Sequence, residues 1–438
     1  MPSGELATSV AVGRTAATIR REFWVRYGAV AAGVVLAAAA YGAAQPPAGW
    51  WGAAWVVPGL VLVSTARLRP GAAFAVGTAF GMLAAYSTVS WAIEAALVYF
   101  AASRWAATAF LLLVWAVLVG PWYGAVVVAY HALGCRVRPW ARPLFAGWLW
   151  AVGEWVRCAL GLPWCLLAHT QVSQLRTIQI ADLGGAYAVT AVLAATSVGT
   201  LEWLVAGARW RALPGACVAW GLLAATLLYG QGRLARAASD APEHVRQVAV
   251  VQTNVANSFA WQRAATAQAL ARYAQLTVSA LTEHPVDLVV WPENAVNFYL
   301  DRDAIMRLPL AEVAARVRGQ LLVGAPRLAD DGSARNAAYL LDAQGTVQAH
   351  YDKRHLLPFA EYRPWPLRAP DDGPAYAPGD TTGAFPLGDD RLGMLICWDA
   401  NFPGLTRELV RAGAGFLVHI SNAAWLDDLG ASAPVRYG

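Results

Sequence analysis

The stretch AATAFLLLVWAVLVGPWYGAVVVAY, residues 106–130, runs for 25 positions without a charged side chain. A helix needs roughly 20 mostly apolar residues to cross about 30 Å of hydrocarbon, so this stretch is long enough to span a membrane. Six further apolar segments of 16 to 28 residues lie before residue 231. The sequence therefore predicts about seven transmembrane helices, at residues 28–44, 51–66, 72–99, 106–130, 144–167, 187–206 and 213–229.

The charged residues divide the chain into two regions. Residues 1–230 carry 14 arginines and 6 acidic side chains, whereas residues 231–438 carry 41 charged side chains. We therefore expect a transmembrane helical domain over 1–230, a linker over 231–246 and a polar domain over 247–438. Because the positive excess lies in the apolar region, a nucleic-acid partner is not expected.

The arginines predict the orientation in the membrane, because short cytoplasmic loops collect cationic residues. Alternate predicted loops share 11 arginines, and the loops between them carry only Arg104 and Arg176. The 11 are Arg14, Arg20, Arg21, Arg26, Arg67, Arg69, Arg136, Arg138, Arg142, Arg209 and Arg211. With a cytoplasmic N-terminus and seven crossings, the polar domain would lie outside the cytoplasm. Within the spans, Glu154 and Arg157 are three residues apart on one helical face, which favours an ion pair or a place at the membrane interface over contact with a lipid headgroup.

The polar domain shows short apolar runs that alternate with amphipathic stretches, a pattern typical of α/β proteins. Strands are predicted at residues 248–255, 287–291, 321–324, 337–342, 347–351, 392–396 and 416–420, and helices at 264–281 and 405–412. Glu293, Lys353 and Cys397 each follow one of these strands. Ligands gather at the carboxyl edge of open α/β sheets, so these three side chains are candidates for one site.

Two of these three candidates, Lys353 and Cys397, are residue types that the sequence uses sparingly. Lys353 is the only lysine among 33 basic residues, and Cys397 is the only cysteine after residue 230. The ammonium of Lys353 is compact and, unlike a guanidinium, has a pKa that its surroundings can shift. The thiol of Cys397 has no cysteine partner in the polar domain, and an unpaired thiol outside the cytoplasm is a candidate nucleophile. With Glu293, the set offers a base, a cation for a developing oxyanion, and a nucleophile. The seven histidines form no metal-ligand spacing with cysteine, so no metal site is expected.

The motifs around these residues resemble a known superfamily. Trp291-Pro292-Glu293, the run KRHLLPFAEY at 353–362 and LICW at 395–398 are similar to the Glu-Lys-Cys motifs of the carbon-nitrogen hydrolase (nitrilase) superfamily. Together with seven upstream spans, they resemble the bacterial apolipoprotein N-acyltransferase family. The resemblance implies a multi-pass α-helical membrane bundle plus an α/β nitrilase-like α-β-β-α sandwich. It also implies a location in the bacterial cytoplasmic (inner) membrane, with the catalytic domain in the periplasm.

The resemblance also implies a reaction and roles for the residues. A fatty acyl chain would move from a phospholipid donor, through a thioester, to the N-terminal amine of diacylated apolipoproteins, without a cofactor. Cys397 would be the nucleophile, Glu293 the proton acceptor, Lys353 the oxyanion partner and Glu361 a supporting acid. Three tryptophans would bind substrate: Trp261, Trp398 and Trp425.

The chain departs from the family pattern near the nucleophile and at its end. Trp398 and Asp399 stand where Tyr and Glu are common, and the sequence stops at Gly438, where the family continues with further strands and an eighth span. We therefore expect a sandwich that is truncated at its C-terminus. Two other functions stay open on the motifs alone: a membrane-anchored amidase that uses water as the acceptor, and a non-catalytic shortened relative.

Overall fold

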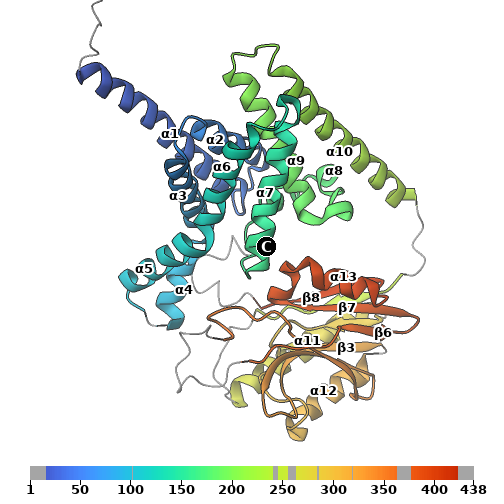
Figure 1. Cartoon of the computed structure of the whole chain (residues 1–438). Helices are drawn as coiled ribbons and strands as arrows, with labels where there is room; N and C mark the ends of the chain where they lie inside the picture. The colour runs from blue at the N-terminus through green and yellow to red at the C-terminus, as the bar shows by residue number, and fades with distance from the viewer. Residues whose placement is uncertain are drawn as a thin grey trace, which may run out of the picture. The chain divides into compact units, whose positions relative to one another are not determined.

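The computed structural model describes residues 16–100, 102–239, 245–254, 263–283, 286–317, 319–362 and 376–422. The chain divides into two compact units, with the boundary after Arg236 (Figure 1). The first unit consists of helices and the second combines helices with β-strands. Each unit is described by itself.

The first unit contains ten α-helices within the described residues. They are α1 (Ala16–Ala44), α2 (Val57–Thr65), α3 (Pro70–Val89), α4 (Trp91–Phe100), α5 (Arg104–Val114), α6 (Gly120–Gly134), α7 (Arg142–Ala159), α8 (Leu175–Ile178), α9 (Ala181–Val205) and α10 (Leu213–Ser239). A π-helical turn, Trp115–Val119, joins α5 to α6 in one continuous apolar helix. Over the described residues, five helices are long and apolar enough to cross a membrane: Tyr27–Ala44, Pro70–Val89, Arg104–Gly134, Ala181–Val205 and Leu213–Ser239.

Five of the seven predicted spans therefore correspond to such helices, and two differ for local reasons. Segment 51–66 begins as a 3-10 helix, Trp51–Val56, before α2, so its regular α-helix is short. Segment 144–167 ends as a helix at Ala159 and carries Glu154 and Arg157 in its apolar run. The predicted segment 72–99 also breaks at Ser90 into α3 and α4. The number of membrane crossings stays a prediction.

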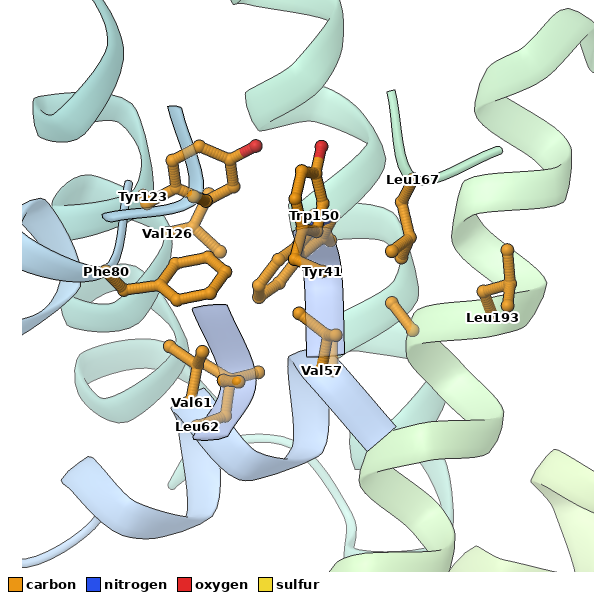
Figure 2. Close-up of a cluster of buried hydrophobic side chains, with 14 of the residues drawn as sticks. Tyr41, Val57, Val61, Leu62, Phe80, Tyr123, Val126, Trp150, Leu167 and Leu193 are labelled. Atoms are coloured by element: carbon orange, nitrogen blue, oxygen red, sulfur yellow. The ribbon is translucent and has the colours of Figure 1, made fainter. Parts of the chain in front are cut away.

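Aromatic rings fill the core of the helical unit (Figure 2). Phe80 of α3 lies 5.2 Å from Tyr123 of α6 and 6.0 Å from Trp150 of α7, measured between ring centroids. Helices α3 and α6 approach closely because glycines face each other. A Cβ on Gly77 would lie 2.8 Å from Cα of Gly124. Small residues at helix contacts are typical of membrane bundles, where close packing drives association.

Glu154 and Arg157 do not form the ion pair that their spacing favours. Both side chains are buried, but no ion pair joins them in the described part of the chain. Glu154 instead accepts hydrogen bonds from the backbone N–H of Leu167 (2.8 Å) and the hydroxyl of Thr190 (2.7 Å). Arg157 donates to the carbonyl of Trp164 (2.6 Å). The two charges therefore fasten α7 to the segment that follows it and to α9.

The second unit contains two β-sheets. The strands are β1 (Val248–Val250), β2 (Leu288–Val290), β3 (Gln320–Leu328), β4 (Ala334–Leu341), β5 (Val347–Asp352), β6 (Ala384–Leu387), β7 (Asp390–Ile396) and β8 (Phe416–Ile420). One sheet has the order β1-β2-β3-β4-β5, with β1, β2 and β3 parallel and the rest antiparallel. The other has the order β6-β7-β8, in which β7 and β8 are parallel. The helices are α11 (Arg263–Glu283), α12 (Ala304–Arg316) and α13 (Pro403–Arg411).

Three apolar layers hold this unit together as an α-β-β-α sandwich (Figure 1). Successive side chains of a strand point to opposite faces of its sheet. Val289 of β2 accordingly packs in the cluster with α11 and α12, whereas Leu288 and Val290 pack between the two sheets. Leu405 and Leu409 of α13 cover the outer face of the second sheet. The predicted fold class is confirmed for the described residues.

Candidate active site

Glu293 follows strand β2 and is held over a glycine. Trp291 extends the strand through a 2.8 Å hydrogen bond from its N–H to the carbonyl of Leu322, and Glu293 lies two residues further. A Cβ at Gly324 of β3 would lie 2.3 Å from the carbonyl oxygen of Pro292 and 2.7 Å from Cα of Glu293. Only glycine therefore lets the backbone that carries Glu293 lie directly on β3. The Glu293 side chain is 6% exposed.

Lys353 follows strand β5, and its ammonium lies between two carboxylates. Its Nζ is 3.3 Å from Oε1 of Glu293 and 2.8 Å from Oε2 of Glu361, and the side chain is 1% exposed. Burial by itself lowers the pKa of Lys353, but Glu293, Cys397 and Glu361 more than offset it and raise the pKa above its usual value. The site therefore holds a fixed positive charge.

An asparagine that the sequence analysis missed joins the two carboxylates. Nδ2 of Asn336, on β4, donates to Oε1 of Glu293 (2.7 Å) and to Oε1 of Glu361 (2.8 Å). The backbone N–H of Leu357 donates to Oε2 of Glu361 (2.7 Å). Asn336 directly precedes the apolar residues 337–341 of β4, and β4 pairs with the strand that delivers Lys353; an amide at this position is a signal that could have identified the residue.

Cys397 lies at the junction of β7 and a 3-10 helix, Cys397–Asn401. Its φ of +49° is rare for a residue other than glycine, and such strained backbone is common at functional sites. The thiol interacts electrostatically with Glu293, Lys353 and Glu361 and hydrogen bonds to the side chain of Ser421. The structure therefore brings the predicted nucleophile, base, cation and supporting acid together.

The electrostatics keep the thiol protonated. Burial, and then the negative charge of Glu293, raise the pKa of Cys397 to about 12. At neutral pH a thiol with this pKa reacts rapidly only if a neighbouring base removes its proton during the attack. Glu293 is the candidate base. It is fixed by the N–H of Asn422, which donates to its Oε2 (3.0 Å), so the Ser421-Asn422 pair contacts both the nucleophile and the base.

Asp399 explains one departure from the family pattern. Its side chain is fully buried. Oδ2 accepts from the hydroxyl of Tyr351 (2.9 Å) and the N–H of Ile396 (3.2 Å), and Oδ1 accepts from the N–H of His355 (2.8 Å). This short acid thus ties the segment that carries Cys397 to the one that carries Lys353. Two aspartate oxygens with three donors form a complete structural anchor.

The predicted tryptophans have different outcomes. Trp398 is 7% exposed, and its ring lies edge-on to Phe402 with centroids 6.4 Å apart. Its role in substrate binding stays a prediction. Trp261 and Trp425 lie outside the described residues. Over the residues that the structure describes, no group of three His, Cys, Asp or Glu side chains is placed to hold a metal ion.

Comparison with known proteins matches both units. Residues 37–199 match the apolipoprotein N-acyltransferase N-terminal domain, and residues 247–432 match the carbon-nitrogen hydrolase family. Among solved structures, a carbon-nitrogen hydrolase from Helicobacter pylori G27 is 21% identical, with a TM-score of 0.31, over 40% of this chain and 59% of that chain. An amidase from Nesterenkonia sp. is 19% identical, with a TM-score of 0.32, over 40% of this chain and 64% of that chain.

Curated relatives cover most of the chain. An apolipoprotein N-acyltransferase from Geobacter metallireducens is 31% identical over 402 residues, which is 88% of this chain and 75% of the relative. One from Caulobacter vibrioides is 31% identical over 365 residues, 76% of this chain and 65% of the relative. This chain thus spans 75% of the first relative's length and 65% of the second's, slightly less than two thirds. On these matches, it belongs to the apolipoprotein N-acyltransferase family.

Proposed function

We propose that this protein transfers a fatty acyl chain from a membrane phospholipid, through a thioester on Cys397, to the N-terminal amine of diacylated apolipoproteins. Family membership supports lipoprotein N-acylation, and the apolar helices support a membrane-bound enzyme. One observation carries the chemical proposal. A buried thiol interacts with a lysine that lies between two glutamates. The phospholipid donor and the residue roles belong to the proposal.

The first half-reaction loads the acyl group. Glu293 accepts the thiol proton while Sγ of Cys397 attacks the ester carbonyl carbon of the phospholipid. The electrons of the C=O bond move to its oxygen, which becomes an oxyanion beside the ammonium of Lys353. When the oxyanion collapses, the C–O bond to the glycerol breaks, and Glu293 returns the proton to the leaving oxygen. A lysophospholipid departs and an acyl-cysteine stays.

The second half-reaction moves the acyl group from Cys397 to the amine. The neutral N-terminal amine of a diacylglyceryl-cysteine attacks the thioester carbonyl, and Glu293 takes a proton from the nitrogen. The C–S bond breaks, and the thiolate of Cys397 recovers the proton. One base thus serves both halves, which suits a pocket that exchanges one lipid substrate for another.

We further propose that the protein lies in the bacterial inner membrane with its catalytic unit on the periplasmic side. The division of arginines between the predicted loops supports this orientation. Both substrates carry acyl chains, so a membrane-embedded enzyme can receive them laterally from the bilayer.

A labelling experiment tests the proposal. The full protein in membranes is incubated with a phospholipid that is radiolabelled in its acyl chain, and a hydroxylamine-sensitive protein adduct is measured. We expect an adduct on the unchanged protein and on Cys217→Ala, a matched control in the first unit, but none on Cys397→Ala. Adding a diacylated lipopeptide should move the label onto its amine. Label released only as free fatty acid would replace the transferase with a hydrolase, and an adduct on Cys397→Ala would refute the thioester.

A further inference from the structure

A large cavity lies within the first unit, and none of the candidate catalytic residues lines it. Its volume is about 1380 Å³, and it is lined by α1, α2, α6, α7, α9, the start of α10 and the segments that follow α2, α6 and α9. Pockets for small ligands measure roughly 300–1,000 Å³, so this cavity can hold a larger molecule. All of its lining residues lie between Ala29 and Gly215, inside the helical unit.

The charged lining of the cavity is mostly cationic. Glu202 is the carboxylate among the lining residues, and the hydroxyl of Tyr130 donates a hydrogen bond to it (2.6 Å). Four arginines accompany it: Arg67, Arg142, Arg209 and Arg211. An excess of three positive charges around one hollow favours an anionic ligand.

Two of these arginines have no acidic partner within the described part of the chain. Arg209 and Arg211 are both exposed and form no ion pair there. Arg211 lies over the ring of Trp210, 5.7 Å from its centroid. Arg142 uses its Nε to donate to the carbonyl of Gly134 (3.2 Å). Guanidinium groups bind phosphate oxygens in a fixed fork geometry, so these side chains suit a phosphate anion.

The rest of the lining is largely apolar. Ala29, Val30, Leu62, Val63 and Val205 contribute aliphatic surface beside the arginines. A free phosphate or a sugar phosphate would leave this surface in contact with water. An amphiphile would cover it with hydrocarbon while its anionic group lies against the arginines, and basic pockets between transmembrane helices bind anionic lipid headgroups in this way.

We propose that this cavity is a binding site for the phosphodiester headgroup of an anionic phospholipid, separate from the acyl-donor site. The four arginines belong to the set predicted to face the cytoplasm, so the lipid comes from the cytoplasmic leaflet. Bound there, it connects the segment after α2, the start of α7 and the segment after α9, and so stabilises the bundle. The proposal does not depend on the reaction at Cys397.

An alternative explanation is that these arginines serve only to orient the protein in the membrane. That role explains why arginines lie in these loops, but it does not require that they surround a cavity. The chain provides a control for this alternative. Arg136 and Arg138 are exposed and belong to the same predicted cytoplasmic set, but neither lines the cavity. If charge alone attracts anionic lipid, both pairs of arginines contribute equally.

The test measures lipid binding to the full protein in nanodiscs of zwitterionic phosphatidylcholine. Phosphatidylglycerol is titrated in, and bound lipid is counted by native mass spectrometry while thermal unfolding is followed by intrinsic fluorescence. Inorganic phosphate and glycerol phosphate serve as soluble probes. The double variant Arg209→Gln/Arg211→Gln is compared with Arg136→Gln/Arg138→Gln, and both replace loop side chains that are exposed.

We expect one phosphatidylglycerol to stay bound and to raise the unfolding temperature. Its affinity should fall about tenfold or more in Arg209→Gln/Arg211→Gln and less than twofold in the control pair, because each cation near a lipid phosphate contributes a several-fold gain. Equal losses in both double variants would overturn the proposal. So would equal retention of phosphatidylcholine, or equal stabilisation by glycerol phosphate, which would assign the site to a soluble phosphate. Acyl-adduct formation, measured separately, reports on Cys397 alone.

Discussion

Replacing Glu293 with glutamine should convert a base-assisted thiol into one that reacts only when it ionises by itself. Burial and the charge of Glu293 raise the pKa of Cys397 to about 12. At pH 7, five units below that value, about one thiol in 10⁵ is ionised. The substitution keeps the size of the side chain but removes the proton acceptor, and the single amide oxygen can accept either from Asn422 or from the donors of Asn336 and Lys353. General-base catalysis contributes typically 10²- to 10⁴-fold, so acyl-adduct formation should slow by about that factor.

The pH dependence of the variant gives a signature that a structural defect does not. With glutamine at 293, burial still raises the pKa of the Cys397 thiol, although the second contribution, from the carboxylate, is gone. The thiolate fraction then rises about tenfold for each pH unit between pH 7 and 9. The adduct rate of the variant should follow that slope. In the unchanged protein the base removes the proton during the attack, so its rate should rise much less over the same range.

The assay is single-turnover formation of the hydroxylamine-sensitive adduct at fixed labelled phospholipid, in half-unit pH steps. Glu312→Gln supplies a matched control, because Glu312 lies exposed on α12 and lines no part of the site. Its rate and pH profile should equal those of the unchanged protein. A near-normal rate for Glu293→Gln at pH 7, or a slow rate that stays flat to pH 9, would refute the assignment of Glu293 as the base.

Three further predictions follow from the same cluster. Lys353→Arg should lose at least about 100-fold in adduct rate and should also lower the unfolding temperature, because a guanidinium does not fit a space shaped for a buried ammonium; a normal rate would show that any cation suffices. Asn336→Leu removes two hydrogen bonds to carboxylates and should slow the reaction about tenfold or more, which the same assay measures. Gly324→Ala should destabilise the protein by about 1–3 kcal/mol in denaturant unfolding, because the new Cβ meets backbone, while Gly404→Ala, where nothing lies within 4 Å, should not.

Much of the second unit was predictable because local pattern and chemistry agree there. Buried strands over 287–291 and 392–396 are short apolar runs, and each ends in a reactive side chain. Strand β6, with sequence AFPL, was missed because its proline argues against a strand. Helix α12 was missed because Pro309 lies inside it and its apolar residues lack a clear helical period.

The parts of the site that were not predicted depend on contacts between distant segments. Asn336 is 43 residues from the carboxylate it contacts, and Gly324 matters only because the backbone of Glu293 crosses it. Asp399 stands where a longer acid is common in the family, and the sequence alone does not show that its side chain accepts hydrogen bonds from Tyr351, His355 and Ile396. A single sequence carries the identity of such residues but not the distances that give them their roles.

The pairing of one ammonium with two carboxylates has a consequence for the energetics of the reaction. When the thiol proton moves to Glu293, that carboxylate becomes neutral, and a negative charge appears instead on the substrate oxygen. Lys353 then exchanges one anionic partner for another, while Glu361, 2.8 Å away, keeps the ammonium in place. The net charge of the buried site stays constant through the step, so no new charge has to be desolvated. A single carboxylate could not do this, because its protonation would leave Lys353 without the partner that positions it. The second glutamate therefore makes the proton transfer and the oxyanion compatible in one buried pocket.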